Sequence, residues 1–431
     1  MLLSATVFPK LNRRTRITCL ATVLALLIPS VAPLPVDFSQ YYHYKNFEKI
    51  VLYFNSFKEA KVIVIGHSWQ NRSIYAILVG DVGRKPIILI VGGHHGREHV
   101  SVQFPLYFAW LLLTNESFRK LLHHYSFIIV PLLNPDGYEV AFINPWHRKN
   151  CRPVDDDGDG LIDEDPPQDV NGDHCIVLYR SGSHVWFEGI DDDGDGKLNE
   201  DWIGGVDLNR NYPFMWDRGI KVKSSLQYRG PSPLSEPETR ALISLIEKYK
   251  YSIILAVSYH SGAKLVLYPW SYTRDPPPDE DLFKDICLVY SNVTKYPILQ
   301  SSKLYLSYGE FMDYMLYEYH ILAITVEIYG RFADYSWYKK HLLRKDSVVI
   351  FKDIYEYFNP TPGKELSSVL KLNAIALKKT LIHYRKYILK EEPVNKDVLR
   401  AALILSIILA TVALATLILD ARKYYKQKLF K

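Results

Sequence analysis

Four short, almost wholly apolar runs rich in Ile and Val constrain the fold of this chain more than any other feature. They cover residues 87–91, 127–133, 253–259 and 321–328, and helical patterns such as residues 102–113 separate them. Strands buried on both faces have continuous apolar sequences, whereas strands with one face in water alternate between apolar and polar residues. We therefore predict an α/β fold with a mixed, largely parallel central sheet covered by helices on both faces.

Both ends of the chain have the pattern of targeting or anchoring segments. Basic residues up to Arg16 precede an apolar stretch, so residues 1–33 are predicted to be a signal peptide. Residues 401–419 carry no charge and would measure about 28 Å as a helix, enough to cross the bilayer core. After the signal peptide we predict a folded domain at residues 38–360 and a helical stalk at residues 361–398. A membrane helix at residues 399–421 and a basic cytoplasmic tail at residues 422–431 would follow.

The charge distribution sets the expected orientation and excludes one class of partner. The net charge is +5, but the first sixteen residues hold four Lys or Arg and the last ten hold five, so the chain between them is acidic. A basic C-terminal tail stays in the cytoplasm, which predicts a single-pass protein of the cell membrane with its folded domain outside. An acidic domain offers no broad basic surface, so we expect no nucleic-acid partner.

Candidate metal ligands stand where two of the apolar runs end. His95 and Glu98 follow residues 87–91, and His260 follows residues 253–259. Ligands bind at the carboxyl ends of strands in α/β sheets, and two His with one Glu form the protein ligand set of a catalytic zinc. A chance His-x-x-Glu spacing and a hydrogen-bonded core histidine are the alternatives.

Further residues offer a base and cations for substrate. Glu327 lies in an apolar run, where a carboxylate is costly unless it is used or paired. Asn209 and Arg210 place an amide beside a guanidinium that can grip a carboxylate, and Arg148 supplies another cation. Each arginine taken alone could be a solvated surface charge.

In combination, these residues resemble the zinc carboxypeptidase family of the pancreatic carboxypeptidase A type. The resemblance extends over roughly residues 41–358. It rests on the first zinc motif Gly-His-His-Gly-Arg-Glu at residues 93–98 and on the strand with the third ligand at residues 259–261. The Asp-x-Asn-Arg-Asn segment at residues 206–212 and two loops at residues 134–138 and 146–149 also match in order.

The resemblance implies a zinc-dependent carboxypeptidase that acts on peptide C-termini. One catalytic zinc would be held by His95, Glu98 and His260, with His94 as a competing candidate. The resemblance also makes Glu327 the general base and Arg148 the partner of the developing oxyanion. It implies that Arg97, Asn209 and Arg210 bind the substrate. Tyr305 would be the mobile capping tyrosine, with Tyr308 as its competitor.

Substrate preference and activity leave alternatives open. Met312 aligns with the base of the side-chain pocket and predicts apolar C-terminal residues, whereas Glu310, if it points inward, would select Lys or Arg. His99 and Gly262 stand where the family has a tryptophan and another aromatic residue. A cell-wall peptide amidase on the same fold, or a calcium-dependent adhesion module on an inactive peptidase fold, are the other functions considered.

An insertion at residues 151–201 contains two near-identical Asp-rich repeats, at residues 155–160 and 191–196. Oxygen ligands at alternating positions before a glycine suit calcium, although no Glu stands at the twelfth position of either loop. The predicted structural calcium ligands are Asp155, Asp157, Asp159, Asp163, Asp191, Asp193 and Asp195. The alternative is a solvated acidic loop.

Two cysteines bracket the same insertion. Cys151 and Cys175 are predicted to form a disulfide, because an extracellular location permits it and the loop would be short. Two unpaired, small apolar side chains are the alternative.

Overall fold

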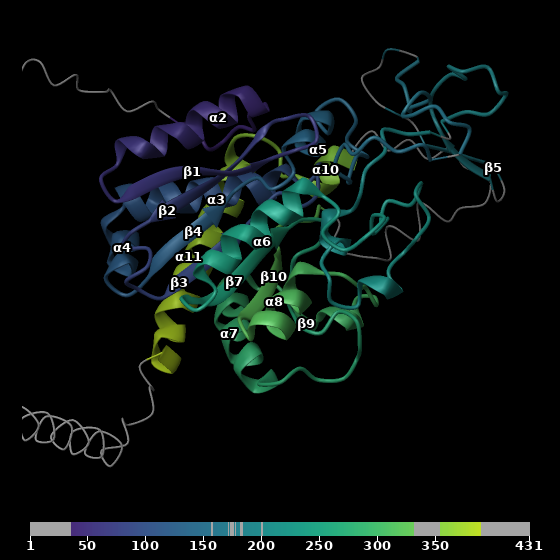
Figure 1. Cartoon of the computed structure of the whole chain (residues 1–431). Coiled ribbons are helices and arrows are strands. Elements are labelled where there is room, and N and C mark those ends of the chain that lie inside the picture. The colour runs from purple at the N-terminus through teal and green to yellow at the C-terminus, as the bar shows by residue number, and fades with distance from the viewer. Residues whose placement is uncertain are drawn as a thin grey trace, which may run out of the picture. The chain divides into compact units, whose positions relative to one another are not determined.

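In the computed structural model, the apolar runs form the centre of one eight-stranded sheet (Figure 1). The strand order is β1-β2-β4-β3-β7-β10-β8-β9. The bounds are β1 Ala60–His67, β2 Ser73–Val79, β3 Ile87–Val91, β4 Ser126–Val130, β7 Ile253–His260, β8 Leu265–Tyr268, β9 Ile298–Gln300 and β10 Leu322–Glu327. The central pairs β4–β3, β3–β7 and β7–β10 are parallel, whereas β1–β2, β2–β4 and β10–β8 are antiparallel, so the predicted mixed sheet is confirmed.

Helices cover this sheet on both sides, as predicted. Helices α3 and α7 both pack on α11, while α6 and α8 lie in front of the sheet in Figure 1. The bounds are α2 Tyr44–Tyr53, α3 His99–Thr114, α4 Glu116–Arg119, α5 Pro135–Val140, α6 Pro237–Tyr249, α7 Glu280–Thr294, α8 Phe311–Tyr319, α10 Ile354–Phe358 and α11 Lys364–Ile388. Every residue of β3 has an exposed fraction of 0%, which explains its wholly apolar sequence.

Helix α11 is part of the folded domain, so the predicted stalk is wrong for residues 364–388. One face of the helix is buried in the domain, and it carries Leu366, Leu370, Ala374, Leu377 and Leu381. The hydroxyl of Tyr125 donates to the carbonyl of Leu381 at 2.8 Å, and that of Tyr290 donates to Asn373 Oδ1 at 2.8 Å. The spacing of the buried residues is that of a helix packed along its whole length.

The Asp-rich insertion has a sheet of its own. Strands β5 (Leu178–Ser181) and β6 (His184–Phe187) form a two-stranded antiparallel ribbon that is not paired with the main sheet. Figure 1 shows β5 at the far right, beyond the helices.

The structure describes residues 36–156, 158–170, 172, 176, 178–181, 184–199, 201–331 and 354–388. Within these ranges no helix has both the length and the apolar character needed to span a membrane. The predicted signal peptide, membrane helix and cytoplasmic tail lie outside the described residues, as do Asp157 and Cys175.

Candidate metal centre and substrate site

Three neighbouring parallel strands deliver the candidate catalytic residues to one end of the sheet. Strand β3 leads to His95 and Glu98, β7 ends at His260, and β10 ends at Glu327. Glu327 lies directly opposite His260 in the pairing of β10 with β7. The carboxyl ends of parallel strands meet at the same edge of a sheet, so these residues converge although they are far apart in sequence.

His95, Glu98 and His260 form a compact donor group that fits a zinc ion. The Nδ1 atom of His95 lies 2.7 Å from Glu98 Oε1, and the Nδ1 atom of His260 lies 3.1 Å from both Glu98 Oε2 and His95 Nδ1. Two ligands held about 2.0–2.1 Å from a tetrahedral zinc lie about 3.3 Å apart, which is close to these separations. The convergence of two imidazole nitrogens and a carboxylate in a buried site suits a cation.

The protonation states of the group also suit metal binding. Burial would raise the pKa of Glu98, but the charge of His95 and hydrogen bonds from both histidines hold that pKa well below its usual range. Burial lowers the pKa of His260, although Glu98 opposes this. An ionised carboxylate and a neutral imidazole are the forms that bind zinc.

His94, the competing ligand, has a different role. Its Nε2 atom lies 2.9 Å from the hydroxyl of Tyr212, and its Nδ1 atom lies 3.4 Å from Ser258 Oγ. Its ring stacks on that of His260. His94 therefore packs beside His260 and is not one of the three converging residues.

Asp207 links the donor group to Arg148, a role that the sequence reasoning missed. Its side chain has an exposed fraction of 0% and lies 3.1 Å from His95 Nε2 and 2.9 Å from Arg148 Nη2. Burial would raise its pKa, but the charges of Arg148, His95 and Arg210 hold the pKa well below the usual range. An ionised Asp207 accepts the Nε2 proton of His95, which leaves Nδ1 for a metal. The available signal was its position at the start of the Asp-x-Asn-Arg-Asn segment.

Glu327 and Arg148 flank the donor group. The Glu327 Oε2 atom is buried without a hydrogen-bond partner. Burial, reinforced by the charge of Glu98, raises the pKa of Glu327 well above its usual value, against the opposing charge of Arg148. Arg148 Nη1 lies 3.8 Å from Glu98 Oε1. A carboxylate that needs a proton or cation and a fixed guanidinium thus lie close to the candidate metal position.

The predicted carboxylate clamp is assembled around Arg210. Its Nη2 atom donates to the hydroxyl of Tyr305 at 3.3 Å, and its Nη1 atom lies 3.0 Å from Glu310 Oε1. Asn209 Oδ1 accepts from the backbone N–H of Phe311 at 2.9 Å, which ties the clamp to the start of α8. Tyr305, with an exposed fraction of 47%, is therefore the tyrosine that contacts the clamp.

The other predicted substrate residues lie in different surroundings. Tyr308, the competitor of Tyr305, lies under the guanidinium of Arg218 instead of Arg210. The guanidinium of Arg97 lies 4.2 Å from the ring centroid of Phe358. Met312 is buried on α8 with an exposed fraction of 2%.

The two Asp-rich repeats cap each other's loops. Asp201 follows the second repeat and accepts from the backbone N–H of Asp156 in the first, at 2.7 Å. Asp165 occupies the equivalent position after the first repeat. It accepts from the backbone N–H of Asp192 in the second repeat at 3.3 Å, and from that of Asn199 just after this repeat at 2.8 Å. Both carboxylates are buried, so the insertion is one interlocked unit.

Carboxylates of the repeats gather in two groups whose oxygens lie within 4.8 Å of one another. One group spans both repeats and the other lies within the second: Asp159, Glu164 and Asp193; and Asp191, Asp193 and Asp195. Of the other predicted ligands, Asp155 Oδ1 accepts from the N–H of Gly158 and Asp163 Oδ1 accepts from that of Gly204.

Cys151 is buried, and Cys175, its predicted disulfide partner, lies outside the described residues, so the disulfide stays a prediction. The sulfur of Cys151 lies 3.7 Å from His147 Nε2.

Comparisons with known proteins agree with this geometry. The family model described as zinc carboxypeptidase matches residues 55–342. A carboxypeptidase B of Astacus astacus is 27% identical over 226 residues, covering 51% of this chain and 60% of the relative. A mast cell carboxypeptidase A of Mus musculus is 27% identical over 259 residues, covering 57% of this chain and 51% of the relative. The chain thus spans little more than half the length of the curated relatives it matches.

Solved structures support the fold. Bovine thrombin-activatable fibrinolysis inhibitor, in complex with a tick carboxypeptidase inhibitor, has a TM-score of 0.57 at 20% identity and covers 81% of this chain and 99% of its own. Carboxypeptidase A of Helicoverpa armigera has a TM-score of 0.54 at 19% identity and covers 85% of this chain and 81% of its own.

Metal analysis of two histidine variants tests the donor group. His260→Ala should lose most of the bound zinc because it removes one of three ligands, while His94→Ala should keep it. Zinc content per folded protein, measured by elemental analysis, separates the two. Equal zinc in His260→Ala and wild type would contradict the assignment.

Proposed function

The chain belongs to the zinc carboxypeptidase family, and we propose that it hydrolyses the C-terminal peptide bond of peptides with one zinc ion held by His95, Glu98 and His260. The observation that carries this proposal is the convergence of these three residues with Glu327 at neighbouring strand ends. Each residue type needed for the reaction is present at this end of the sheet.

The mechanism assigns each step to a residue of this chain. A bound zinc would supply Lewis acidity toward the attacking water and the scissile carbonyl. Glu327 would take the proton of the water and return it to the leaving amine. The guanidinium of Arg148, fixed by Asp207, would donate to the developing oxyanion. Arg210 would hold the terminal carboxylate of the substrate beneath Tyr305.

This reading is favoured over both alternatives. An adhesion module on an inactive peptidase fold would be expected to have lost a ligand or the base, whereas this chain keeps His95, Glu98 and His260 together and has Glu327 opposite His260. The name of one relative, of Schizosaccharomyces pombe, describes it as inactive, at 25% identity. The buried Arg210, oriented by Glu310 and Tyr305, suits a substrate with a free terminal carboxylate, which favours the carboxypeptidase over the amidase.

For the substrate, we propose a preference for C-terminal Lys or Arg, in place of the apolar preference expected from Met312. Glu310 points inward onto Arg210 and also accepts from Ser271 Oγ at 2.7 Å. A substrate carboxylate that binds Arg210 would compete with Glu310 for this guanidinium and leave the Glu310 carboxylate without its cation. Leaving a buried charge without its partner costs roughly 3–5 kcal/mol. A basic substrate side chain would replace that partner, and an apolar one would not.

We propose that the catalytic domain lies outside the cell on a single-pass membrane protein. The support is the predicted signal peptide, the uncharged residues 401–419 and the basic residues that follow them. Peptides in the extracellular space would then be the substrates.

We also propose that the Asp-rich repeats bind calcium as a structural ion. The group of Asp159, Glu164 and Asp193 draws ligands from both repeats, so an ion there would join the two loops. Three carboxylates so close together repel one another unless a cation or protons neutralise them. The ion would stabilise the insertion without supplying catalytic groups.

Replacing the general base should separate catalysis from metal binding. Glu327→Gln should retain zinc but lose about 10²–10⁴ in kcat, because the amide cannot take the proton of the water. Turnover of a blocked dipeptide and zinc content should be measured on the same samples, with the exposed Glu318→Gln as control. Unchanged turnover in Glu327→Gln would remove this residue from the mechanism.

Glu310→Gln tests the substrate preference while keeping a side chain of the same shape. Wild type should have the higher kcat/KM for C-terminal Lys than for C-terminal Leu, and the variant should lose at least about tenfold of that ratio, equivalent to 1.4 kcal/mol. Glu318→Gln on the same helix should leave the ratio unchanged. A wild-type preference for Leu, unaffected by the substitution, would restore the apolar reading.

Calcium should raise the melting temperature of the zinc-loaded protein. A ligand at a hundredfold excess over its Kd stabilises the folded state by about 2.7 kcal/mol. An Asp159→Ala/Asp193→Ala double variant should lose most of this response, while a control pair in exposed positions elsewhere, Asp217→Ala/Asp281→Ala, should keep it. If all three proteins melt alike at every calcium concentration, the repeats are a solvated acidic loop.

A further inference from the structure

The side chain of Asn359 forms hydrogen bonds with the backbone on both sides of the candidate zinc ligand Glu98. Asn359 follows α10 and has an exposed fraction of 1%. Its Nδ2 atom donates to the carbonyl of Arg97 at 2.8 Å, and its Oδ1 atom accepts from the N–H of Val100 at 3.0 Å. These two peptide groups flank Glu98, from which Asn359 is distant in sequence.

The contact with Val100 supplies a cap that Glu98 does not provide. Glu98 is the N-cap residue of α3, and Val100 is the second residue of that helix. The first N–H groups of a helix lack partners within it, and the N-cap side chain usually accepts one of them. Glu98 makes no such bond, because its carboxylate meets His95 and His260 and accepts from the N–H of Ser261 at 3.0 Å. Asn359 takes over the capping role.

Helix α10, which precedes Asn359, contacts residues next to Glu98 in the chain. The hydroxyl of Tyr355 lies 2.7 Å from His99 Nδ1, and the ring of Phe358 lies under the guanidinium of Arg97. Phe358 also reaches Gly262, two residues after His260, where an added Cβ would lie 2.9 Å from its ring. The two positions at which the sequence departs from the family resemblance, His99 and Gly262, are thus both partners of α10.

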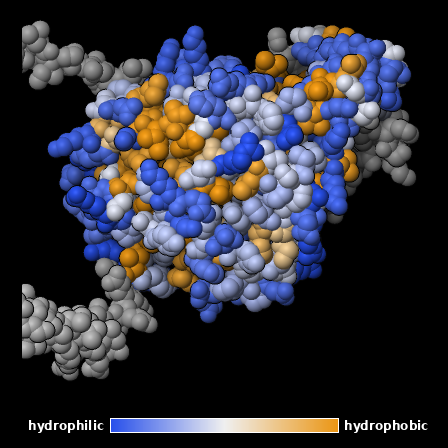
Figure 2. All heavy atoms as spheres, viewed as in Figure 1, coloured by the Kyte–Doolittle hydropathy of each residue, from blue (hydrophilic) through white to orange (hydrophobic). Residues whose placement is uncertain are grey.

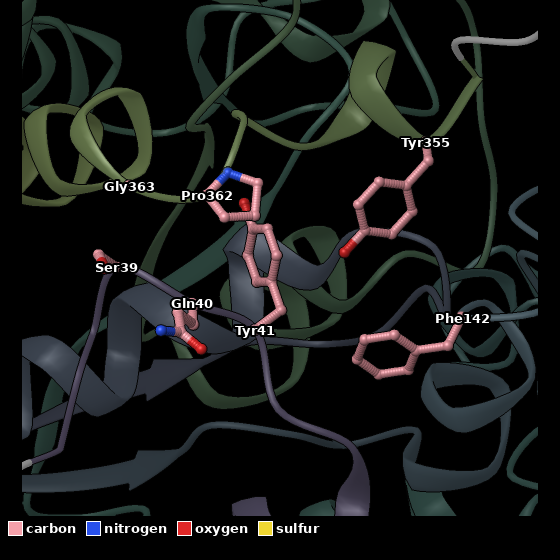
Figure 3. Close-up of a pocket in the computed structure, with 7 residues that line it drawn as sticks. All are labelled: Ser39, Gln40, Tyr41, Phe142, Tyr355, Pro362 and Gly363. Carbon is pink, nitrogen blue, oxygen red and sulfur yellow. The ribbon is translucent and has the colours of Figure 1, made fainter.

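One side of this segment borders an open pocket of about 570 Å³ lined by the residues labelled in Figure 3: Ser39, Gln40, Tyr41, Phe142, Tyr355, Pro362 and Gly363. Ile354 and Phe358 of α10 also pack in a buried cluster with Trp146 and Ile176. The hydrogen bonds of Asn359 and Tyr355 and the contact of Phe358 with Arg97 attach this packed segment to the zinc motif.

We propose that Asn359 is a positioning residue of the zinc site, which caps α3 from outside the helix and so leaves the carboxylate of Glu98 for the metal. Without Asn359, the N–H of Val100 would be buried with no acceptor, and the carboxylate nearest to it along the chain is that of Glu98. Capping and metal binding would then compete for the same oxygens. The inference rests on the proposed function because it requires the zinc site.

Zinc affinity of the full-length protein tests this role. Asn359→Ala should raise the zinc Kd about 10–100-fold, the range usual for residues that orient metal ligands. The matched control is Asn373→Ala, which removes an equally buried amide from α11, where it accepts from Tyr290. Asn373→Ala should lower the melting temperature but leave the zinc Kd near the wild-type value, as measured by competition with a chromogenic chelator.

A second variant separates the cap from the other bond and serves if Asn359→Ala does not fold. Asn359→Asp keeps an acceptor for the N–H of Val100 but loses the donor to the carbonyl of Arg97. Its zinc Kd should therefore stay within about tenfold of the wild-type value. An Asn359→Asp protein that is folded but binds zinc more than tenfold more weakly would overturn the capping role.

The remaining outcomes distinguish this inference from the proposed function. Wild type and Asn359→Ala with the same zinc Kd, or an equal loss in Asn373→Ala, would overturn the inference alone. A wild-type protein that binds no zinc would overturn the proposed function and this inference with it.

Discussion

The parallel pairing of β3, β7 and β10 is the constraint on which the rest of the site depends. Three adjacent strands that run in one direction end at the same edge of the sheet, so the residues at and after their ends lie close together. Full burial of β3 requires helices on both faces. Helix α3, which starts directly after Glu98, supplies one of these layers and also fixes the backbone of the zinc motif. Fold and site are therefore set by the same elements.

Charge balance explains why so many ionisable groups share this buried end of the sheet. Asp207 is held ionised by Arg148 and His95, and it orients both of them in return. Glu98 and Glu327 add two more acids, and a divalent cation among them would offset charge that Arg148 alone does not balance. Figure 2 shows apolar and polar residues mixed over the visible face of the molecule, whereas the side chains of Asp207 and Glu98 are buried, with exposed fractions of 0% and 2%.

Local patterns predicted the strands and the donor group, because each depends on a few consecutive residues. The run at β3 was predicted to the residue, and the three ligand candidates His95, Glu98 and His260 were found because they follow or end strands. Asp207, Asn359 and the crossed caps of Asp165 and Asp201 could not be predicted in this way. Their partners are distant in sequence, and a single buried Asp or Asn has no periodic signal.

Helix α11 shows a different kind of failure. The apolar stripe that buries it is present in the sequence at helical spacing, but its place before an uncharged segment suggested a stalk. The periodicity was the better guide, because an apolar face along a whole helix requires a partner surface. In the structure that surface is provided by α3 and α7.

The most direct test of the account is the release of a C-terminal residue by the full-length protein, with zinc bound and after its removal. The substrates should be a peptide with a free C-terminal carboxylate and the same peptide with a C-terminal amide. We expect release from the free peptide only, loss of release after chelation and recovery when zinc is restored. Equal cleavage of the amidated peptide, or activity that survives complete removal of zinc, would contradict it.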